Sequence, residues 1–298
     1  MQPVVAAMVA DYFKKNGGAY EIAYSPGPRG SLEIAREHAR TGAAVRLYAC
    51  GGDGTLFDVV NGAYGYPNAQ VGMIPCGAGN DFLKYFGGAE KFLDIDAQVK
   101  GSAFPMDLIR CGGFYSVNQC SMGMDAEIAA SKNHFIRWPF VSGKLAYTLA
   151  VFYQFTKKLS SKYRVVIDDG EVLEGEYLFA VAPNANPCDG RLEFVLIDRV
   201  GRLRIAGLLG RYRQGTHVKL GICTLRHGGV MEVTAPAPAA VNMDGEIMFM
   251  RTARFELVEK GIRFIVPGVS AVECGEREKR AGQRSKLAAP ACDYEARR

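Results

Sequence analysis

Two glycine-rich segments each follow a short apolar run and precede a helical pattern. The first, CGGDGTLF at 50–57, comes after AAVRLYA, and the second, CGAGNDF at 76–82, comes after VGMIP. Neither apolar run has a helical period, which predicts two buried strands, each followed by a turn and a helix. At the carboxyl end of such a strand, backbone N–H groups of the turn and the helix start point outward together and form an anion site. Only glycine lets a phosphate chain lie directly against that backbone.

The residues of these two loops are therefore candidates for binding a nucleotide and its metal ion. They are Gly51, Gly52, Asp53, Gly54 and Thr55 in the first loop, and Gly77, Ala78, Gly79, Asn80 and Asp81 in the second. Either loop alone could be a tight strand-to-helix connection with Asp or Asn as the helix cap. Two such loops on consecutive units, each with an acidic group, favour a nucleotide with Mg²⁺. Neither loop fits the GxGxxG or the GxxxxGK[ST] fingerprint, so a different phosphate-binding arrangement is implied.

The order of predicted elements divides the chain into two domains and a tail. After an amphipathic first helix, strands at 20–25, 44–50 and 71–76 alternate with helices at 31–41, 56–65 and 80–87, which predicts an α/β domain over 1–105 with a Rossmann-like parallel sheet. Over 106–268, β-rich runs separated by Gly, Asp or Pro predict an antiparallel β-sandwich, with helices at 124–132, at 144–159 and near 202–214. The polar stretch 269–298 predicts a disordered tail.

Composition and charge exclude several classes of protein. Apolar residues make up 48% of the 298 positions and charged residues 22%, which is typical of a folded protein with a large core. The net charge of +5 is small and gives no reason to expect a nucleic-acid partner. Eight cysteines without a CxxC pair indicate free thiols in a reducing cytosol. The start is no signal peptide, and the most apolar helical run, 145–155, is too short to cross a bilayer.

Several segments resemble the diacylglycerol kinase catalytic family, which includes bacterial lipid kinases and sphingosine kinases and is distantly related to NAD kinases. In the family's order they are GGDGTLxxVVNG (51–62), IPxGxGNDF (74–82), MDLIR (106–110), SMGMDAEI (121–128), GKLAY (143–147), APNANPCDGRLEF (182–194) and NMDGEIM (242–248). The resemblance implies an ATP- and Mg²⁺-dependent kinase that transfers the γ-phosphate to a lipid hydroxyl, by default that of diacylglycerol, giving phosphatidic acid. NAD kinases share GGDGT but not PxGxGNDF, so an NAD kinase is the weaker alternative.

The resemblance also implies roles for individual residues. The two loops and Lys84 would hold ATP, and Asp53, Asp81, Asp107 and Asp189 are the candidate metal ligands, the last for a structural Mg²⁺ that some bacterial members hold. Asp244 and Glu246 would approach from the second domain as the catalytic carboxylates. We expect Asp244 to take the proton from the lipid hydroxyl and Glu246 to orient it or the metal shell. Two plainer interpretations stay open, a solvated Lys84 and a simple turn at Asp189-Gly190.

Three departures from the family pattern favour an alternative class, a catalytically impaired nucleotide-binding or regulatory homologue. The family's first strand and NPxSG-like loop are not found, so either the start codon is misplaced or a sheet strand and a nucleotide contact are missing. The asparagine and Gly-rich segment before the APxA part is also absent, and Ala78 replaces a common threonine that donates to phosphate. Retention of all the acidic residues above argues for an active enzyme.

The acceptor and the partners follow from the resemblance as well. Diacylglycerol is the default acceptor, but sphingoid bases, other glycerolipids or polyprenol-like alcohols could also be the acceptor in such a cleft. Because such acceptors live in bilayers, we expect a cytoplasmic protein that works peripherally at the inner face of the membrane. The sequence does not set the oligomeric state, and a homodimer is a candidate.

Overall fold

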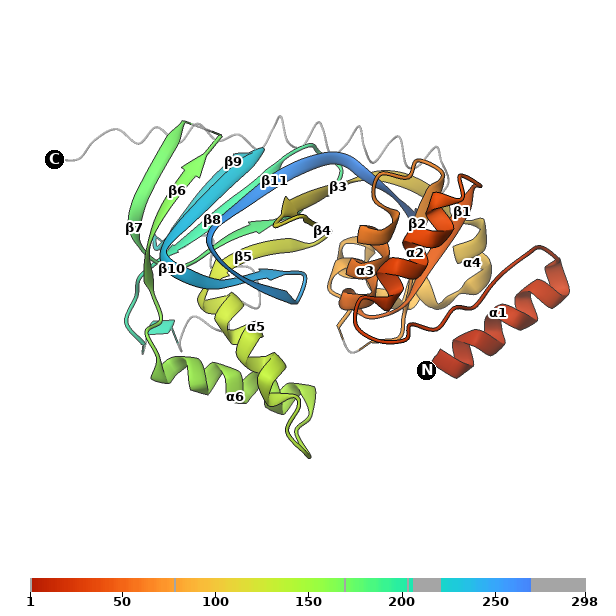
Figure 1. Ribbon diagram of the computed structural model, residues 1–298, viewed down its shortest axis with the longest axis horizontal. Helices are drawn as coiled ribbons and strands as arrows, with labels where there is room; N and C mark the ends of the chain where they lie inside the picture. The colour runs from red at the N-terminus through yellow and green to blue at the C-terminus, as the bar shows by residue number, and fades with distance from the viewer. Residues whose placement is uncertain (1, 78, 169, 203, 206–220, 269–298) are drawn as a thin grey trace.

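The computed structural model describes residues 2–77, 79–168, 170–202, 204–205 and 221–268 (Figure 1). The predicted tail, Ala78 and most of the helix predicted near 202–214 lie outside these ranges. The N-terminal part contains eight elements, namely α1 (Gln2–Asn16), α2 (Gly30–Arg40), β1 (Val45–Gly51), α3 (Asp53–Ala63), β2 (Ala69–Pro75), the 3-10 helices η1 (Phe82–Phe86) and η2 (Ala89–Leu93), and α4 (Ile95–Lys100).

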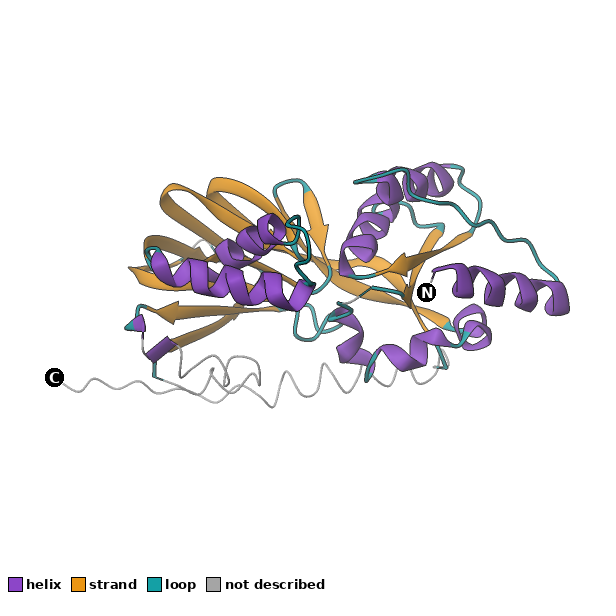
Figure 2. Cartoon of the chain, turned by 90° about the horizontal axis from the view of Figure 1, so that it is seen from below, coloured by secondary structure: helices purple, strands orange, loops and turns teal. Residues whose placement is uncertain are grey.

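The C-terminal part is built mainly of strands. They are β3 (Ser102–Cys111), β4 (Phe114–Ser116), β5 (Gln119–Gly123), β6 (Ser161–Ile167), β7 (Glu171–Pro183), β8 (Leu192–Asp198), β9 (Cys223–Gly228), β10 (Val230–Met243) and β11 (Glu246–Val266). Two helices, α5 (Met124–Phe135) and α6 (Gly143–Thr156), come between β5 and β6. Figure 2 shows the helices of this part lying across the strands.

The predicted Rossmann-like parallel sheet is wrong, because the sheet is mixed. Strand β1 runs parallel to β2, and β2 meets the end of β11 in parallel at Val71 and Phe264. Strand β3 runs antiparallel to β11, and the remaining strands of the C-terminal part also pair antiparallel. The 21-residue β11 runs from the C-terminal part into the N-terminal part, so one hydrogen-bonded sheet spans both (Figure 1).

The strand predicted at 20–25 is not formed. Residues 17–26 have no regular secondary structure and are exposed, and β1 is the edge of the sheet in the described part of the chain. An alternating apolar pattern makes a stable strand only where a neighbour can accept and donate its backbone hydrogen bonds. Without such a neighbour, the segment runs past the sheet as an extended connection to α2.

Two apolar cores support the cleft between the parts. The first packs α2 and α3 against β1, β2 and the far end of β11, with Leu56, Met73 and Phe264 fully buried. The second lies inside the curled strands of the C-terminal part, which gives that part its sandwich architecture. Phe57 of α3 is buried in this second core, so α3 contributes one face to each core and holds the two parts together.

Candidate active site in the cleft between the two parts

The two glycine loops contact each other directly. The carbonyl oxygen of Gly51 accepts hydrogen bonds from the N–H groups of Cys76 (2.9 Å) and Gly77 (3.1 Å). A Cβ atom added at Gly77 would stand 2.5 Å from the Cα of Gly52 and 2.7 Å from its nitrogen, closer than real Cβ atoms approach. Glycine is therefore needed at this point because the two backbones touch, in addition to any contact with a ligand.

Asp53 and Asp81 meet across the two loops. The Asp53 Oδ2 atom accepts a hydrogen bond from the Asp81 N–H at 3.2 Å, and the Asp53 N–H donates to the Gly79 oxygen at 3.3 Å. The other carboxylate oxygen, Oδ1, is buried and has no hydrogen-bond partner among the described residues. Burial raises the pKa of Asp53, and the Asp81 N–H opposes this shift. A buried carboxylate oxygen without a donor is a suitable ligand for a divalent cation.

The other loop residues shape the two turns. The Thr55 side chain packs on Gly51, where an added Cβ would lie 2.1 Å from Oγ1, and Asn80 Nδ2 donates to the Gly77 oxygen at 3.2 Å. The Lys84 ammonium pairs with the Asp81 carboxylate on the surface of η1. Lys84 does not itself line the cleft, but this ion pair places its ammonium beside the second glycine loop.

Asp244 lies at the two-residue turn between β10 and β11, and its carboxylate is bonded by a loop of the C-terminal part. The Oδ2 atom accepts from the Val117 N–H (2.7 Å), and Oδ1 accepts from the N–H groups of Asn118 (3.1 Å) and Gln119 (2.9 Å). Burial raises the pKa of Asp244 to about 6, although these hydrogen bonds work in the opposite direction. Both oxygens are thus engaged in holding the loop 117–119.

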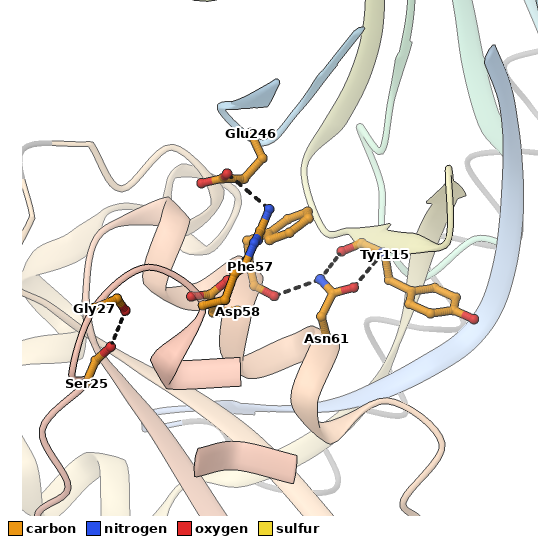
Figure 3. A network of polar contacts seen from close by, with 8 residues as sticks. Ser25, Gly27, Phe57, Asp58, Asn61, Tyr115 and Glu246 are labelled. Carbon is orange, nitrogen blue, oxygen red and sulfur yellow. Dashed lines mark hydrogen bonds and ion pairs between the residues drawn. The ribbon is translucent and has the colours of Figure 1, made fainter. Parts of the chain in front are cut away.

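Glu246 reaches from the C-terminal part to the start of α3. Its Oε1 atom lies 3.6 Å from the position that a Cβ would take at Gly54. Its Oε2 atom accepts a hydrogen bond from Arg29 Nη2 at 3.1 Å (Figure 3). Of the two carboxylates in the DGE segment, Glu246 is the one that faces the first glycine loop.

Arg29 was not singled out by sequence analysis, although it connects both parts. Its Nη1 atom donates to Asp58 Oδ1 at 2.8 Å, and its guanidinium lies 5.0 Å from the ring centroids of Phe57 and Phe114. The residue precedes α2 with a left-handed backbone (φ 63°) in the turn PGPRG. That turn matches no segment of the family pattern, so only a lone arginine before a helix indicates this role in the sequence.

Asp107 and Asp189 lie away from the cleft. Asp107 is 3% exposed and accepts hydrogen bonds from the N–H groups of Gly190 (2.9 Å) and Lys260 (2.8 Å). Asp189 accepts from the Arg191 N–H at 3.2 Å and from Asn186 Nδ2 at 3.2 Å. In the described ranges, no group of three or more His, Cys, Asp or Glu residues is placed to hold a metal ion. Asp107 anchors two backbone segments, and neither residue joins Asp53 and Asp81.

A cavity of about 590 Å³ begins at the glycine loops and passes into the C-terminal part. Gly52, Asp53, Gly54, Gly79 and Asp81 line one end, and Gln119, Asp244 and Glu246 line the middle. The far end is apolar and lies between the helices and the strands, where it is lined by Met124, Ile128, Tyr147, Leu178, Phe179 and Ile197. One continuous space therefore joins an anion-binding backbone to an apolar chamber.

Asp125 lies where the polar and apolar sections of this cavity meet. Neither of its carboxylate oxygens has a hydrogen-bond partner of ordinary geometry within the described residues, and both are hidden from solvent. Burial raises the pKa of Asp125 to about 6, with the Ser121 hydroxyl and the Ala126 N–H opposing the shift. The segment SMGMDAEI alone predicts no role for Asp125, since only the folded chain shows its unpaired oxygens.

Comparison with known proteins agrees with this geometry. Residues 3–111 match the diacylglycerol kinase catalytic domain, and residues 118–266 match the YegS C-terminal NAD kinase beta sandwich-like domain. The chain therefore belongs to the diacylglycerol kinase family, and it is a lipid kinase.

Curated relatives and solved structures extend the comparison. The chain is 24% identical over 240 residues to a probable lipid kinase YegS-like from Shewanella frigidimarina, covering 74% of this chain and 76% of the relative. It is 23% identical over 268 residues to a diacylglycerol kinase from Staphylococcus carnosus, covering 85% and 87%. A crystal structure of a diacylglycerol kinase from Bacillus anthracis superposes with a TM-score of 0.60 at 15% identity, covering 83% of this chain and 85% of that one. At this identity the superposition supports the fold.

Proposed function

We propose that the protein transfers the γ-phosphate of Mg²⁺-bound ATP to the hydroxyl of diacylglycerol, giving phosphatidic acid. The observation that carries the proposal is the continuous cavity, whose ends have the chemistry of the two substrates. The glycine-loop end offers backbone donors for phosphate oxygens, and the apolar end suits acyl chains. The family relationship makes ATP the phosphate donor, and diacylglycerol is what the names of several relatives indicate for those proteins.

The residues present fit a magnesium ion. Asp53 has a buried carboxylate oxygen without a donor, and Asp81 lies directly beside it. Magnesium prefers one or two carboxylates together with water and substrate phosphates, which matches this small donor set. When bound, the ion would offset charge on the phosphate oxygens. Asp53 and Asp81 would hold it, while Asp107 and Asp189 are too committed to the backbone elsewhere to take part.

We assign the general base to Glu246 rather than to Asp244. Both oxygens of Asp244 accept backbone hydrogen bonds, whereas Glu246 Oε1 faces Gly54 in the cleft. Glu246 would accept the proton as the lipid oxygen attacks the γ-phosphorus and ADP leaves. Asp244 then keeps the loop 117–119 in place.

The test is transfer of radiolabelled γ-phosphate to diacylglycerol in mixed micelles, beside a total lipid extract. We expect one labelled lipid with Mg²⁺ and none with EDTA. The matched variant is Glu246→Gln, which should lose most turnover while calorimetry still detects ATP binding. Label in a different lipid would identify that lipid as the acceptor in place of diacylglycerol, and the assignment as a lipid kinase would stand. Bound ATP with no labelled lipid would favour the impaired nucleotide-binding homologue.

The domain limits 1–105 and 106–268 remain predictions. The formation of a homodimer also remains a prediction.

A further inference from the structure

The connection between α5 and α6 exposes large apolar side chains. Ile136 is 42% exposed, Trp138 is 50% exposed, and Phe140 is fully exposed on a left-handed backbone (φ 64°). In Figure 1 this helical hairpin projects away from the strands, with its connection at the far end. We call these three residues the α5–α6 tip. Three exposed apolar side chains within five residues are unusual on a surface that faces only water.

The tip is supported by aromatic packing at its base. The Phe135 ring contacts the Trp138 ring edge-to-face at 5.2 Å between centroids, and it contacts Tyr153 of α6 in the same way at 5.8 Å. On α6, Leu145 and Phe152 are also exposed. The tip therefore has a defined shape before any partner binds, and its apolar surface continues along α6.

The charge around the tip has one sign. From 128 to 160 the chain has no Asp or Glu, and its charged residues are Lys132, Arg137, Lys144, Lys157 and Lys158. Lys132, Arg137, Lys157 and Lys158 are exposed. Lys157 lies over the Tyr153 ring, 4.3 Å from its centroid. Aromatic and aliphatic side chains at a tip, with cations within it and beside it, are the pattern of a surface that binds an anionic bilayer.

The tip is also close to the apolar chamber. Ile128 and Lys132 of α5 line the cavity, and Ile136 follows one helical turn after Lys132. Tyr147 of α6 lines the same cavity from the other side of the hairpin. A lipid that leaves a bilayer at the tip thus has a short path to the chamber.

We propose that the α5–α6 tip inserts into the interface of an anionic membrane and presents the apolar chamber to it. The purpose of this docking rests on the proposed function, but the binding itself needs neither ATP nor an acceptor. It can therefore be measured with vesicles alone, and it can fail while the kinase activity stands.

The chain carries its own probe, because Trp138 is its single tryptophan. We expect vesicles of phosphatidylcholine and phosphatidylglycerol to shift its emission to the blue, and lipids brominated in the acyl chain to quench it. Pure phosphatidylcholine vesicles should bind more weakly, and added salt should reduce binding to the anionic ones. Unchanged emission with anionic vesicles would overturn the proposal. A blue shift that depends on protein concentration without vesicles would overturn it in favour of a second copy of the chain.

The matched variants separate the tip from general surface hydrophobicity. The double variant Ile136→Ser and Phe140→Ser should weaken vesicle flotation by about tenfold or more, because two apolar side chains no longer leave water. The control Phe249→Ser removes a side chain that is 65% exposed on β11 and should bind as the unaltered chain does. Thermal unfolding should be the same for all three. Equal binding of the double variant would overturn the assignment, and lost binding with intact phosphorylation of a short-chain, water-soluble diacylglycerol would support it.

Discussion

Asp244 adopts a left-handed backbone (φ 51°) at the turn after β10, and this places its carboxylate over the loop 117–119. Three backbone N–H groups donate to it, at distances from 2.7 to 3.1 Å. Hydrogen bonds to a charged acceptor are stronger than neutral ones, and buried donors that lose their acceptor are costly. Asp244, which the sequence favoured as the general base, therefore also has a structural role. This role distinguishes it from Glu246.

Substitution of Asp244 by Asn should destabilise the fold. The amide keeps one acceptor oxygen, but its NH₂ group faces backbone donors and leaves at least one of them unpaired. We expect the free energy of unfolding to fall by about 2 to 4 kcal/mol near pH 5. The loss should be smaller at pH 8, where the amide also removes the cost of ionising a buried carboxyl whose pKa is raised to about 6. Urea denaturation measures it, with Glu246→Gln as the control that should change little, since that side chain is partly exposed. Equal midpoints for the two variants would contradict this role of Asp244.

Asp125 should make stability depend on pH. Burial raises its pKa from 3.8 to about 6, so the folded state resists ionisation more than the unfolded state does. The resulting destabilisation is absent below about pH 4, grows as the pH rises towards 6 and is complete above it. Asp125→Asn removes it and should stabilise the protein at pH 8 by up to about 3 kcal/mol, with little gain at pH 4. Urea unfolding at the two pH values measures the effect, and a gain independent of pH would contradict it.

Elements with a local signal were predictable from the sequence. Two adjacent glycines are a local hairpin signal, and Gly112-Gly113 joins β3 to β4 with positive φ at both glycines (55° and 84°). The helices at 31–41 and 56–65 are also confirmed, as α2 and α3. Each of these elements is specified by residues within one turn or one helix.

Elements that depend on distant partners were not predictable. The β-rich runs before and after Gly261 belong to one strand, β11, although the sequence predicts runs separated by glycine. Near Gly261 the strand is irregular, with a register shift between Val258 and Ile262 and a positive φ at Lys260 (52°). The candidate site shows the same contrast. The glycine loops were predictable from short segments, whereas the hydrogen bonds of Asp244 join residues about 125 positions apart.

The contact between the two glycine loops gives a prediction at the scale of elements. Gly77→Ala would force the loops after β1 and β2 apart, because the new Cβ would meet Gly52 backbone atoms at 2.5 and 2.7 Å. We expect ATP affinity to fall at least about tenfold, because the phosphate-binding N–H groups lose their alignment. Calorimetric titration with ATP measures it. Gly201→Ala is the control, since a Cβ there meets nothing within 4 Å, and equal affinities would show that the contact does not shape the site.

At the scale of the whole molecule, α3 and β11 fix the two parts against each other. Asn61 of α3 donates from Nδ2 to the oxygens of Phe57 (2.7 Å) and Tyr115 (2.8 Å), and its Oδ1 atom accepts from the Tyr115 N–H at 2.8 Å (Figure 3). The rings of Tyr64 and Tyr115 stack at 3.6 Å between centroids. With β11 continuous through both parts, the cleft is held by covalent chain, hydrogen bonds and stacking on one side, while Arg29 bridges it on the other.

Arg29 should therefore position Glu246 across the cleft. Its guanidinium bonds Asp58 and Glu246 at once and lies over the adjacent rings of Phe57 and Phe114, an arrangement that a lysine ammonium cannot reproduce. If Glu246 is the base, Arg29→Lys should lower kcat about tenfold, which corresponds to loss of one charge-assisted hydrogen bond, and leave ATP binding nearly unchanged. Steady-state kinetics and calorimetry separate the two effects.

A double-mutant cycle distinguishes positioning of Glu246 from a general structural role. In the Glu246→Gln background, Arg29→Lys should have almost no further effect on kcat, because the group it positions no longer accepts a proton. The double variant should then have the same residual rate as Glu246→Gln alone. Additive losses would instead mean that Arg29 acts on the phosphates or on α3 through Asp58, and that the two parts of the molecule are not coupled through the Arg29–Glu246 contact.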